Sequence, residues 1–289
     1  MNIISKTRLW FFISGTLITI GLFALVFNGM TRGKVMNFGI DFTGGTMINL
    51  RFSQPVTVAQ VREILHGHQL GEAVIQKSGE RDVLIRTEPL EGEVRQKVVA
   101  ELGEKLGGAE LLESDTIGPV IGRELRTQAI WALVLASAGI VIYVSFRFEL
   151  IYAFAGVLAL LHDAIITTGF IALLWRPTDV TFVAAILTIL GYSINDTIVI
   201  FDRIRENLKK PGASKIKFSE LVNRSLWETM ARSINTVLTV LVVVLALLIF
   251  GGETLKEFSL VLLIGFTLGA YSSIFIAAPL VVMWEKGKK

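Results

Sequence analysis

The 289-residue sequence contains no cysteine and only three histidines, and just 18% of its residues are charged. The lack of cysteine excludes disulfides, thiolate metal sites and cysteine nucleophiles. Two of the histidines, His66 and His68, form only an i,i+2 pair in a polar segment, which does not favour a His-rich metal site. A soluble domain needs a charged surface, so the low charge content argues against one large soluble core.

Long apolar runs are what the sequence has in abundance. Hydrophobic residues make up 52% of the chain and gather in uninterrupted blocks. Each block is close to the ~20 residues that carry a helix across the hydrocarbon core of a bilayer. None alternates with period two, so a membrane β-barrel is excluded. The predicted transmembrane helices cover residues 9–27, 129–146, 150–175, 180–201, 233–250 and 258–284.

The first block follows Lys6 and Arg8 and so resembles a signal peptide. Its apolar part is longer than a typical signal peptide's, and "NGMTRG" after it offers no cleavage site. We therefore expect a retained signal-anchor helix. It completes an even number of spans, which places both termini on one side of the membrane.

Lysine and arginine gather on that same side. The loop 203–232, the short turn with Arg147 and the tail "EKGKK" all carry them, whereas the opposite short loops hold only Arg176 and Lys256. The positive-inside rule makes the basic side cytoplasmic, both termini included. Orientation and anionic lipid explain the basic loop better than nucleic acid does. Within it, "KFSELVNRSLWETMARS" carries an apolar stripe that predicts a helix lying at the membrane surface.

The polar segment 31–123 then lies outside the cytoplasm and has a pattern of its own. "TMINLRF" alternates as a strand, "TVAQVREILHG" begins at a plausible N-cap, Thr57, and "EGEVRQKVVAELGEKLG" is helical. With "EAVIQKS", "RDVLIRT" and "AELLESDTI" as strands, the order β-α-β-β-α-β predicts a ferredoxin-like α+β domain. The predicted organisation is residues 1–30 with the first helix, an extracytoplasmic domain 31–123, and a five-helix bundle 124–289 with the basic cytoplasmic loop 203–232.

Two carboxylates within spans, Asp163 and Asp196, are the strongest functional candidates. An Asp at the centre of a membrane helix costs ~2.5–3.5 kcal/mol on insertion scales, and such residues face the bundle interior. From the helical rise, Asp163 lies roughly 20 Å, and Asp196 roughly 9 Å, from the cytoplasmic ends of their helices. Arg232 begins the following span and can approach Asp196 through Asn195, Asn235 or water.

Two interpretations of these acids stay open. One is a proton relay, in which each carboxylate takes up a proton on one side and releases it to the other. The other is structural, with the acids locking neighbouring helices together. His162 is expected to point to a different helix face from Asp163, since adjacent helical residues diverge by about 100°, and to be a buried hydrogen-bonding residue. The supporting residues are Asn195, His162, Thr197 and Asn235.

Other patterns carry less chemistry. Gly265 and Gly269 form a GxxxG, for which close helix packing and coincidence are about equally good explanations. The glycines of "NFGIDFTGGT" lack the Lys-Ser/Thr of a P-loop, so nucleotide binding is rejected there. The sequence shows no Ser–His–Asp set or metal cluster, so we do not expect an enzyme, and we expect no cofactor.

Several long stretches resemble SecF-like proteins, membrane subunits of the SecD/SecF protein-export family, which is of the resistance-nodulation-division transporter type. They are "FGIDFTGGT", "IGPVIGRELR", "LLHDAIITTGF", "LTILGYSINDTIVIFDRIREN" and "GGETLKEFSLVLLIGFTLGAYSSIFIAAPL". The resemblance covers nearly the whole chain. It implies six spans and a periplasmic domain, in the bacterial cytoplasmic (inner) membrane.

The resemblance also implies a function. It is proton-motive-force-dependent help in late-stage preprotein translocation, with SecD and the channel of SecY, SecE and SecG as partners. In the family, the acid of "GYSxND", here Asp196, and an Arg near the start of the fifth span, here Arg232, belong to the proton pathway, with the acid of "LHD", here Asp163, as a further candidate. Two alternatives remain, a proton-coupled half-transporter of a small solute or lipid and a non-transporting scaffold.

Overall fold

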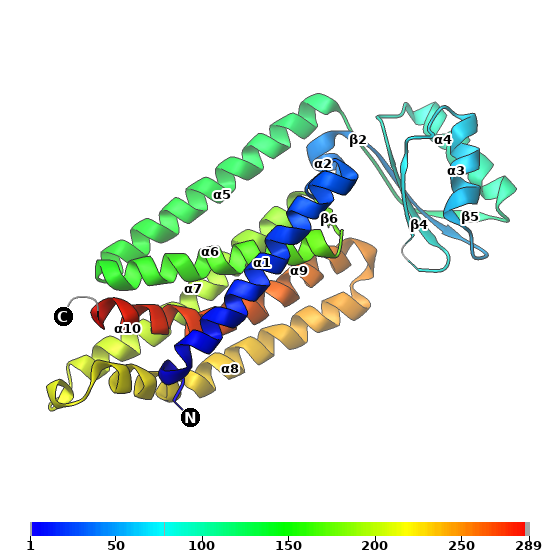
Figure 1. Cartoon of the computed structure of the whole chain (residues 1–289). Coiled ribbons are helices and arrows are strands. Elements are labelled where there is room, and N and C mark those ends of the chain that lie inside the picture. The colour runs from blue at the N-terminus through cyan, green and yellow to red at the C-terminus, as the bar shows by residue number, and fades with distance from the viewer. Residues whose placement is uncertain (1, 78, 287–289) are drawn as a thin grey trace. The chain divides into compact units, whose positions relative to one another are not determined.

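The computed structural model describes residues 2–77 and 79–286 of the chain. The chain forms two compact units, one of Met1–Asn37 with Trp131–Lys289 and one of Phe38–Ile130 (Figure 1). The domain boundaries expected after residues 30 and 123 each lie seven residues before the observed unit boundaries, which follow residues 37 and 130. The first helix, α1 (Thr7–Arg32), runs past residue 30, and a long helix, α5 (Pro119–Arg147), runs through the second boundary.

The smaller unit has the predicted order β-α-β-β-α-β. Its sheet has the order β3-β4-β2-β5, and each neighbouring pair is antiparallel. This is the split β-α-β arrangement of a ferredoxin-like domain, with β4 lying between β2 and β3. The elements are β2 (Gly45–Phe52), α3 (Val58–Gly67), β3 (Val74–Lys77), β4 (Asp82–Thr87), α4 (Gly92–Lys105) and β5 (Ala109–Ile117).

Local signals in this unit act as expected. Thr57 caps α3 through a capping box, in which Gln60 N donates to Thr57 Oγ1 at 3.3 Å and Thr57 N donates to Gln60 Oε1 at 2.9 Å. One face of the sheet and of both helices forms a separate hydrophobic core. Its fully buried members include Ile48, Leu50 and Val61.

The double glycine of "FTGGT" serves the backbone. Gly44 and Gly45 have φ of 72° and 133°, a region that side chains disfavour. A Cβ on Gly45 would collide with the Thr87 carbonyl, and one on Gly44 would lie 3.1 Å from Pro119 Cα. The pair therefore lets the start of β2 lie directly against the start of α5, where Pro119 occupies the first helical turn.

Within the described residues, six helices are long and apolar enough to cross a membrane, as predicted. The last of them is interrupted by a single π turn, η3. The elements other than α1 and α5 are α6 (Leu150–Leu173), α7 (Val180–Leu208), α8 (Phe218–Phe250), α9 (Gly252–Ser272), η3 (Ser273–Ala277) and α10 (Ala278–Lys286).

The prediction of a long basic loop with a separate surface helix was wrong. α7 continues to Leu208, and α8 already begins at Phe218 and runs without a break into the fifth span. No Gly or Pro interrupts residues 218–250, so nothing ends the helix there. Its apolar stripe, including Leu221 and Val222, is buried against the bundle instead of facing a membrane surface.

The spans differ sharply in burial. In their most apolar stretches, 56% of the residues are buried in α6 and in α7, and 61% in Leu255–Glu285. The corresponding values are 17% for the first span, 6% for α5 and 11% for α8. Three spans therefore form the centre of the bundle, and three present broad apolar faces to their surroundings, as membrane-facing helices do.

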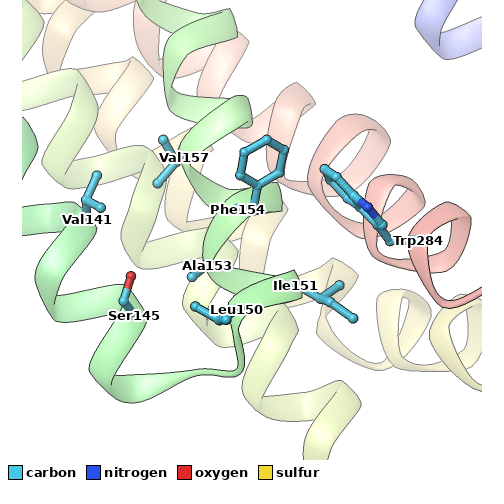
Figure 2. Close-up of a pocket in the computed structure, with 8 residues that line it drawn as sticks. All are labelled: Val141, Ser145, Leu150, Ile151, Ala153, Phe154, Val157 and Trp284. Atoms are coloured by element: carbon cyan, nitrogen blue, oxygen red, sulfur yellow. The ribbon is translucent and has the colours of Figure 1, made fainter. Parts of the chain in front are cut away.

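A groove of about 410 Å³ lies between α5, α6 and α10 (Figure 2). Phe154 and Trp284 form one wall of it, with their rings edge to face at 4.6 Å. Among the residues that the structure describes, no ionisable side chain lines the groove. Its lining residues are Val141, Ser145, Leu150, Ile151, Ala153, Phe154, Val157 and Trp284.

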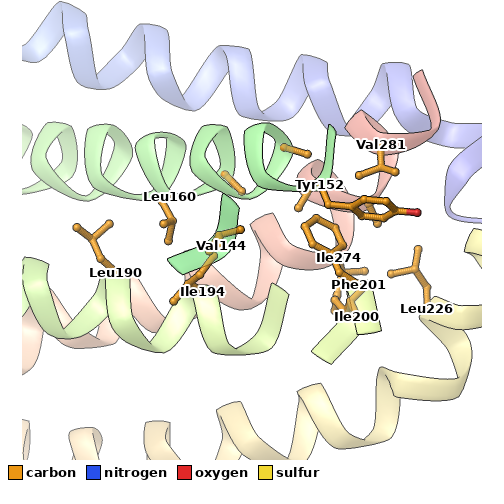
Figure 3. Close-up of a cluster of buried hydrophobic side chains, with 14 of the residues drawn as sticks. Val144, Tyr152, Leu160, Leu190, Ile194, Ile200, Phe201, Leu226, Ile274 and Val281 are labelled. Atoms are coloured by element: carbon orange, nitrogen blue, oxygen red, sulfur yellow. The ribbon is translucent and has the colours of Figure 1, made fainter. Parts of the chain in front are cut away.

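The main hydrophobic core fills the space between α6, α7 and the last span (Figure 3). Phe201 lies between Phe148 and Tyr152 in edge-to-face contacts of 5.9 and 5.2 Å. Leu226 at the start of α8 belongs to the same cluster. This packing fixes the rotation of α6 and α7 and thereby the direction in which their polar side chains point.

Candidate functional site

Asp163 lies at the centre of the bundle with no solvent exposure, 0%. Its Oδ2 accepts two hydrogen bonds, from Ser193 Oγ on α7 at 2.6 Å and from Ser272 Oγ at the end of α9 at 2.7 Å. Its Oδ1 lies 2.9 Å from His162 Nδ1. In the part of the chain that is described, no Lys or Arg nitrogen lies within 4.0 Å of this carboxylate.

His162 is buried, as predicted, but the expectation that it turns away from Asp163 was wrong. The Cα–Cβ bonds of adjacent helical residues do diverge, yet Nδ1 is attached close to the backbone, and the ring can rotate back to its neighbour. The opposite nitrogen, Nε2, lies 3.0 Å from Ser14 Oγ on α1. His162 therefore links the carboxylate to a third helix.

Tyr271 on α9 extends this network. Its hydroxyl donates to the Trp10 carbonyl at 2.9 Å and lies 3.2 Å from Ser14 Oγ. Its ring stacks on the His162 ring, with centroids 6.1 Å apart. A continuous set of hydrogen bonds thus joins α1, α6, α7 and α9 around Asp163.

Glycines let these helices approach one another. Gly265 and Gly269 of the GxxxG face α7, where a Cβ on Gly265 would collide with Ile189 and one on Gly269 would lie 3.0 Å from Ser193 Cβ. The pair therefore marks close helix packing, and this packing brings Ser193 and Ser272 to the same carboxylate oxygen.

A second close contact joins α1 and α6. A Cβ on Gly21 would lie 3.0 Å from Gly169 Cα. Seven residues before Gly21 is Ser14, which contacts His162, and seven residues after it is Asn28, whose Nδ2 donates to the Ala172 carbonyl at 2.8 Å. These contacts form a parallel seam of small and polar residues, which we call the α1–α6 seam.

Asp196 is half-buried on α7 and has one hydrogen-bond partner. Ser233 Oγ on α8 donates to its Oδ1 at 2.6 Å, while the buried Oδ2 has no partner among the described residues. The neighbouring Arg232 is exposed and, in the described part of the chain, forms no ion pair with Asp196. Asn195 and Asn235 are exposed as well, and neither side chain is hydrogen-bonded to Asp196 within the residues that the structure describes.

Thr197 connects the two carboxylate regions. Its Oγ1 lies 2.8 Å from Ser273 Oγ, and Ser273 in turn donates to the Ser193 carbonyl at 3.4 Å. Ser273 is the first residue of the π turn η3, and such turns are frequent at functional sites. Hydroxyl groups therefore lead from the Asp163 site to the residue beside Asp196.

Most of these hydroxyl residues were not anticipated. A serine in a span carries no charge signal, and its partner depends on how the helices are rotated. Two positional signals were nevertheless present, because Ser193 is three residues before Asp196 and Ser233 directly follows Arg232. The unanticipated residues are Ser14, Ser193, Ser233, Tyr271, Ser272 and Ser273.

Ionic contacts gather where α7 ends and α8 begins. Glu228 accepts from Arg203 Nε at 2.7 Å, Arg224 Nε at 2.9 Å and Asn207 Nδ2 at 2.8 Å. This cluster holds the end of α7 to the first turns of α8.

Comparison with known proteins agrees with this arrangement. Residues 98–287 match the family "Protein export membrane protein SecD/SecF, C-terminal", and residues 23–56 match the "SecD/SecF GG Motif". The second match contains the double glycine at the start of β2. The first match contains His162, Asp163, Ser193 and Ser272, whereas Trp10 and Ser14 on α1 lie before the start of the second match.

Curated relatives and a solved structure extend the match over the whole chain. The protein translocase subunit SecF of Sebaldella termitidis is 44% identical over 98% of this chain and 92% of its own. That of Calditerrivibrio nitroreducens is 42% identical over 100% and 95%. The crystal structure of SecDF, a translocon-associated membrane protein from Thermus thermophilus, is 37% identical with a TM-score of 0.88, over 99% of this chain and 39% of that one. The chain therefore belongs to the SecD/SecF family of protein-export membrane proteins.

Proposed function

We propose that this protein couples the proton motive force to late-stage preprotein translocation. It acts with SecD beside the channel of SecY, SecE and SecG in the bacterial cytoplasmic (inner) membrane. Family membership and relatives named as translocase subunits support a role in export. The chain spans only 39% of the SecDF structure that it matches, which supports the need for a second subunit.

The observation that carries the proton coupling is the environment of Asp163. A fully buried carboxylate is costly unless a cation or a proton neutralises it. Hydroxyl groups and one imidazole surround it, and no Lys or Arg is paired with it in the described residues. A proton is then the remaining means of neutralising the site, so its charge state follows proton supply.

Asp196 completes the proposed relay on the cytoplasmic side. It lies nearer the cytoplasmic end of its helix, it is only half-buried, and its Oδ2 has no protein partner. That oxygen is available to receive a proton or a water molecule. Thr197, Ser273 and Ser193 supply hydroxyl and carbonyl groups between Asp196 and Asp163. Arg232 directly precedes Ser233, whose hydroxyl donates to Asp196.

In the proposed mechanism, proton binding and release move the helices. The mechanism needs neither a cofactor nor a catalysed reaction on the preprotein. Loss of the Asp163 proton would leave a charge among four helices, and they would repack around it. The unit Phe38–Ile130 is proposed to lie outside the cytoplasm, with both termini inside, and to hold or release an emerging polypeptide as the bundle shifts.

Carboxylate neutralisation tests the proposal. Inverted membrane vesicles carrying the full chain with SecD would be loaded with a preprotein, and export would be followed with and without a proton gradient. We expect Asp163→Asn and Asp196→Asn to abolish the gradient-dependent part and leave ATP-driven export intact. Asp202→Asn is a matched control, because that carboxylate pairs with Arg147 at 3.1 Å and is 40% exposed. Wild-type gradient dependence in both test variants would refute the relay.

A further inference from the structure

The hydrogen bonds from Trp10 to His162 run in one direction only. A carbonyl oxygen can only accept a hydrogen bond, so the Tyr271 hydroxyl donates its one proton to the Trp10 carbonyl at 2.9 Å. The Tyr271 oxygen must then accept from Ser14 Oγ, 3.2 Å away. Ser14 has a single hydroxyl proton, so at 3.0 Å it accepts from His162 Nε2. Nε2 of this histidine therefore carries a proton.

That result constrains the other side of the imidazole. Nδ1 faces Asp163 Oδ1 at 2.9 Å, and a neutral ring protonated at Nε2 has only a lone pair there. An ionised carboxylate would turn a second lone pair toward it. A proton must therefore lie between Nδ1 and Oδ1. Ser193 and Ser272 both donate to Oδ2, which leaves Oδ1 as the oxygen that shares it.

We propose that His162 and Asp163 bind the transported proton as one pair and that the observed geometry is the proton-loaded form of the pair. Ser14 and Tyr271 are positioning residues, and the direction of their hydrogen bonds differs between the loaded and the released form. On release the pair loses one proton. Nδ1–H stays against the ionised Asp163, and Nε2 becomes an acceptor. Ser14 turns its hydroxyl proton from Tyr271 to Nε2, while Tyr271 stays on the Trp10 carbonyl. The inference rests on the proposed function only in taking this proton to be the one that drives export.

The surroundings favour the loaded form. In the loaded form Nε2, Ser14 and Tyr271 make three successive hydrogen bonds, and release leaves Tyr271 without the bond from Ser14. Among the described residues, Tyr271 from α9 is the other titratable group that faces the pair, and α1 and α7 bring only hydroxyl groups. On α7, Tyr192 lies beside Ser193, and the next carboxylate is Asp196, whose ionised form opposes a second negative charge at Asp163; exposed Arg232 on α8 lies beyond it.

Nitrogen-15 NMR of histidine tests the assignment directly. The full chain with SecD in lipid bilayers, carrying His66→Gln and His68→Gln, retains one histidine. We expect Nε2 to be protonated in the loaded state. A single transition at higher pH should convert it to the neutral Nδ1–H tautomer. An Nδ1–H tautomer throughout, or no transition, would overturn the proposal.

The relay is tested by two matched serines. Ser14→Ala removes the link to Tyr271, and Ser259→Ala removes a buried hydroxyl that has no partner. Losing the bond that favours the loaded form should lower the proton affinity of the pair about three- to tenfold, which moves the transition down by about 0.5–1 pH unit. Ser259→Ala should leave it in place, and Tyr271→Phe should shift it in the same direction as Ser14→Ala. Unshifted transitions in both relay variants would refute the directional chain.

The two levels of the proposal fail separately. If the tautomers switch as expected but Asp163→Asn retains gradient-dependent export, the pair binds a proton that export does not use. If export depends on Asp163 while His162 keeps one tautomer, the relay through Ser14 is wrong and the proposed function stands.

Discussion

A single added methyl group at Gly169 should separate α1 from α6. A Cβ there would collide with Gly21 Cα, and one on Gly21 would lie 3.0 Å from Gly169 Cα. Carbon atoms pack at about 3.5–4.0 Å, so the helices would have to part by roughly 1–1.5 Å. Overpacking of this kind costs about 1–3 kcal/mol. The partner atom belongs to a backbone, so no side chain can rotate away.

Gly15→Ala on α1, the partner helix, is the control, because a Cβ there meets nothing within 4 Å. Each change should gain about 1 kcal/mol from the intrinsic preference of alanine for a helix. The difference between Gly169→Ala and Gly15→Ala then isolates the contact, and we expect about 1–3 kcal/mol lower unfolding free energy for Gly169→Ala. Unfolding of the full chain in mixed micelles, followed by tryptophan fluorescence, measures it. Equal stabilities would show that the two helices do not depend on this contact.

Other parts of the chain give further predictions. Thr57→Ala should destabilise the start of α3 by about 1 kcal/mol, because it removes the capping box, and hydrogen exchange in that first turn should quicken. Hydrogen bonding to Lys105 lowers the pKa of Glu101, so its stabilising effect is present above the ordinary pKa of 4.5 and is lost as the pH falls through the lowered value. The melting temperatures of Glu101→Gln and the parent should therefore differ at neutral pH and converge in acid. A single cysteine at Glu91 or at Lys209, in a chain that has no other, should react with an impermeant maleimide from opposite sides of the membrane. Labelling from the same side would contradict the proposed orientation.

Much of the architecture could be predicted because bilayer physics leaves few choices. The apolar blocks specify the spans, and an acid inside a span is conspicuous by its cost. The β-α-β-β-α-β order followed from alternation and from one good N-cap at Thr57. The prediction was wrong at the start of α8, where it assigned the polar stretch and the apolar stretch to two helices. No residue between the two stretches ends a helix, so they form one.

The site itself could be predicted only in part. Asp163 and Asp196 stand out by charge, but their partners Ser193, Ser272 and Ser233 are ordinary in a membrane helix. Which serine meets which acid depends on helix rotation, and that is set by contacts such as those of Gly265 and Gly269. Spacing along the chain carries no information about such rotation, so it could not single out Ser233, next to Arg232, as the residue that donates to Asp196.

The α1–α6 seam limits the kind of motion that the bundle can make. Its contacts lie seven residues apart along α1, at Ser14, Gly21 and Asn28, but their partners on α6 are His162, Gly169 and Ala172. A slide along the helix axis therefore does not re-form all three contacts, and it would set Gly21 against a side chain instead of Gly169. The seam therefore resists sliding of the two helices along each other and still permits them to rock together. The proposed proton-driven movement of the bundle would then reach α1 as a tilt of the paired helices α1 and α6, with their register kept.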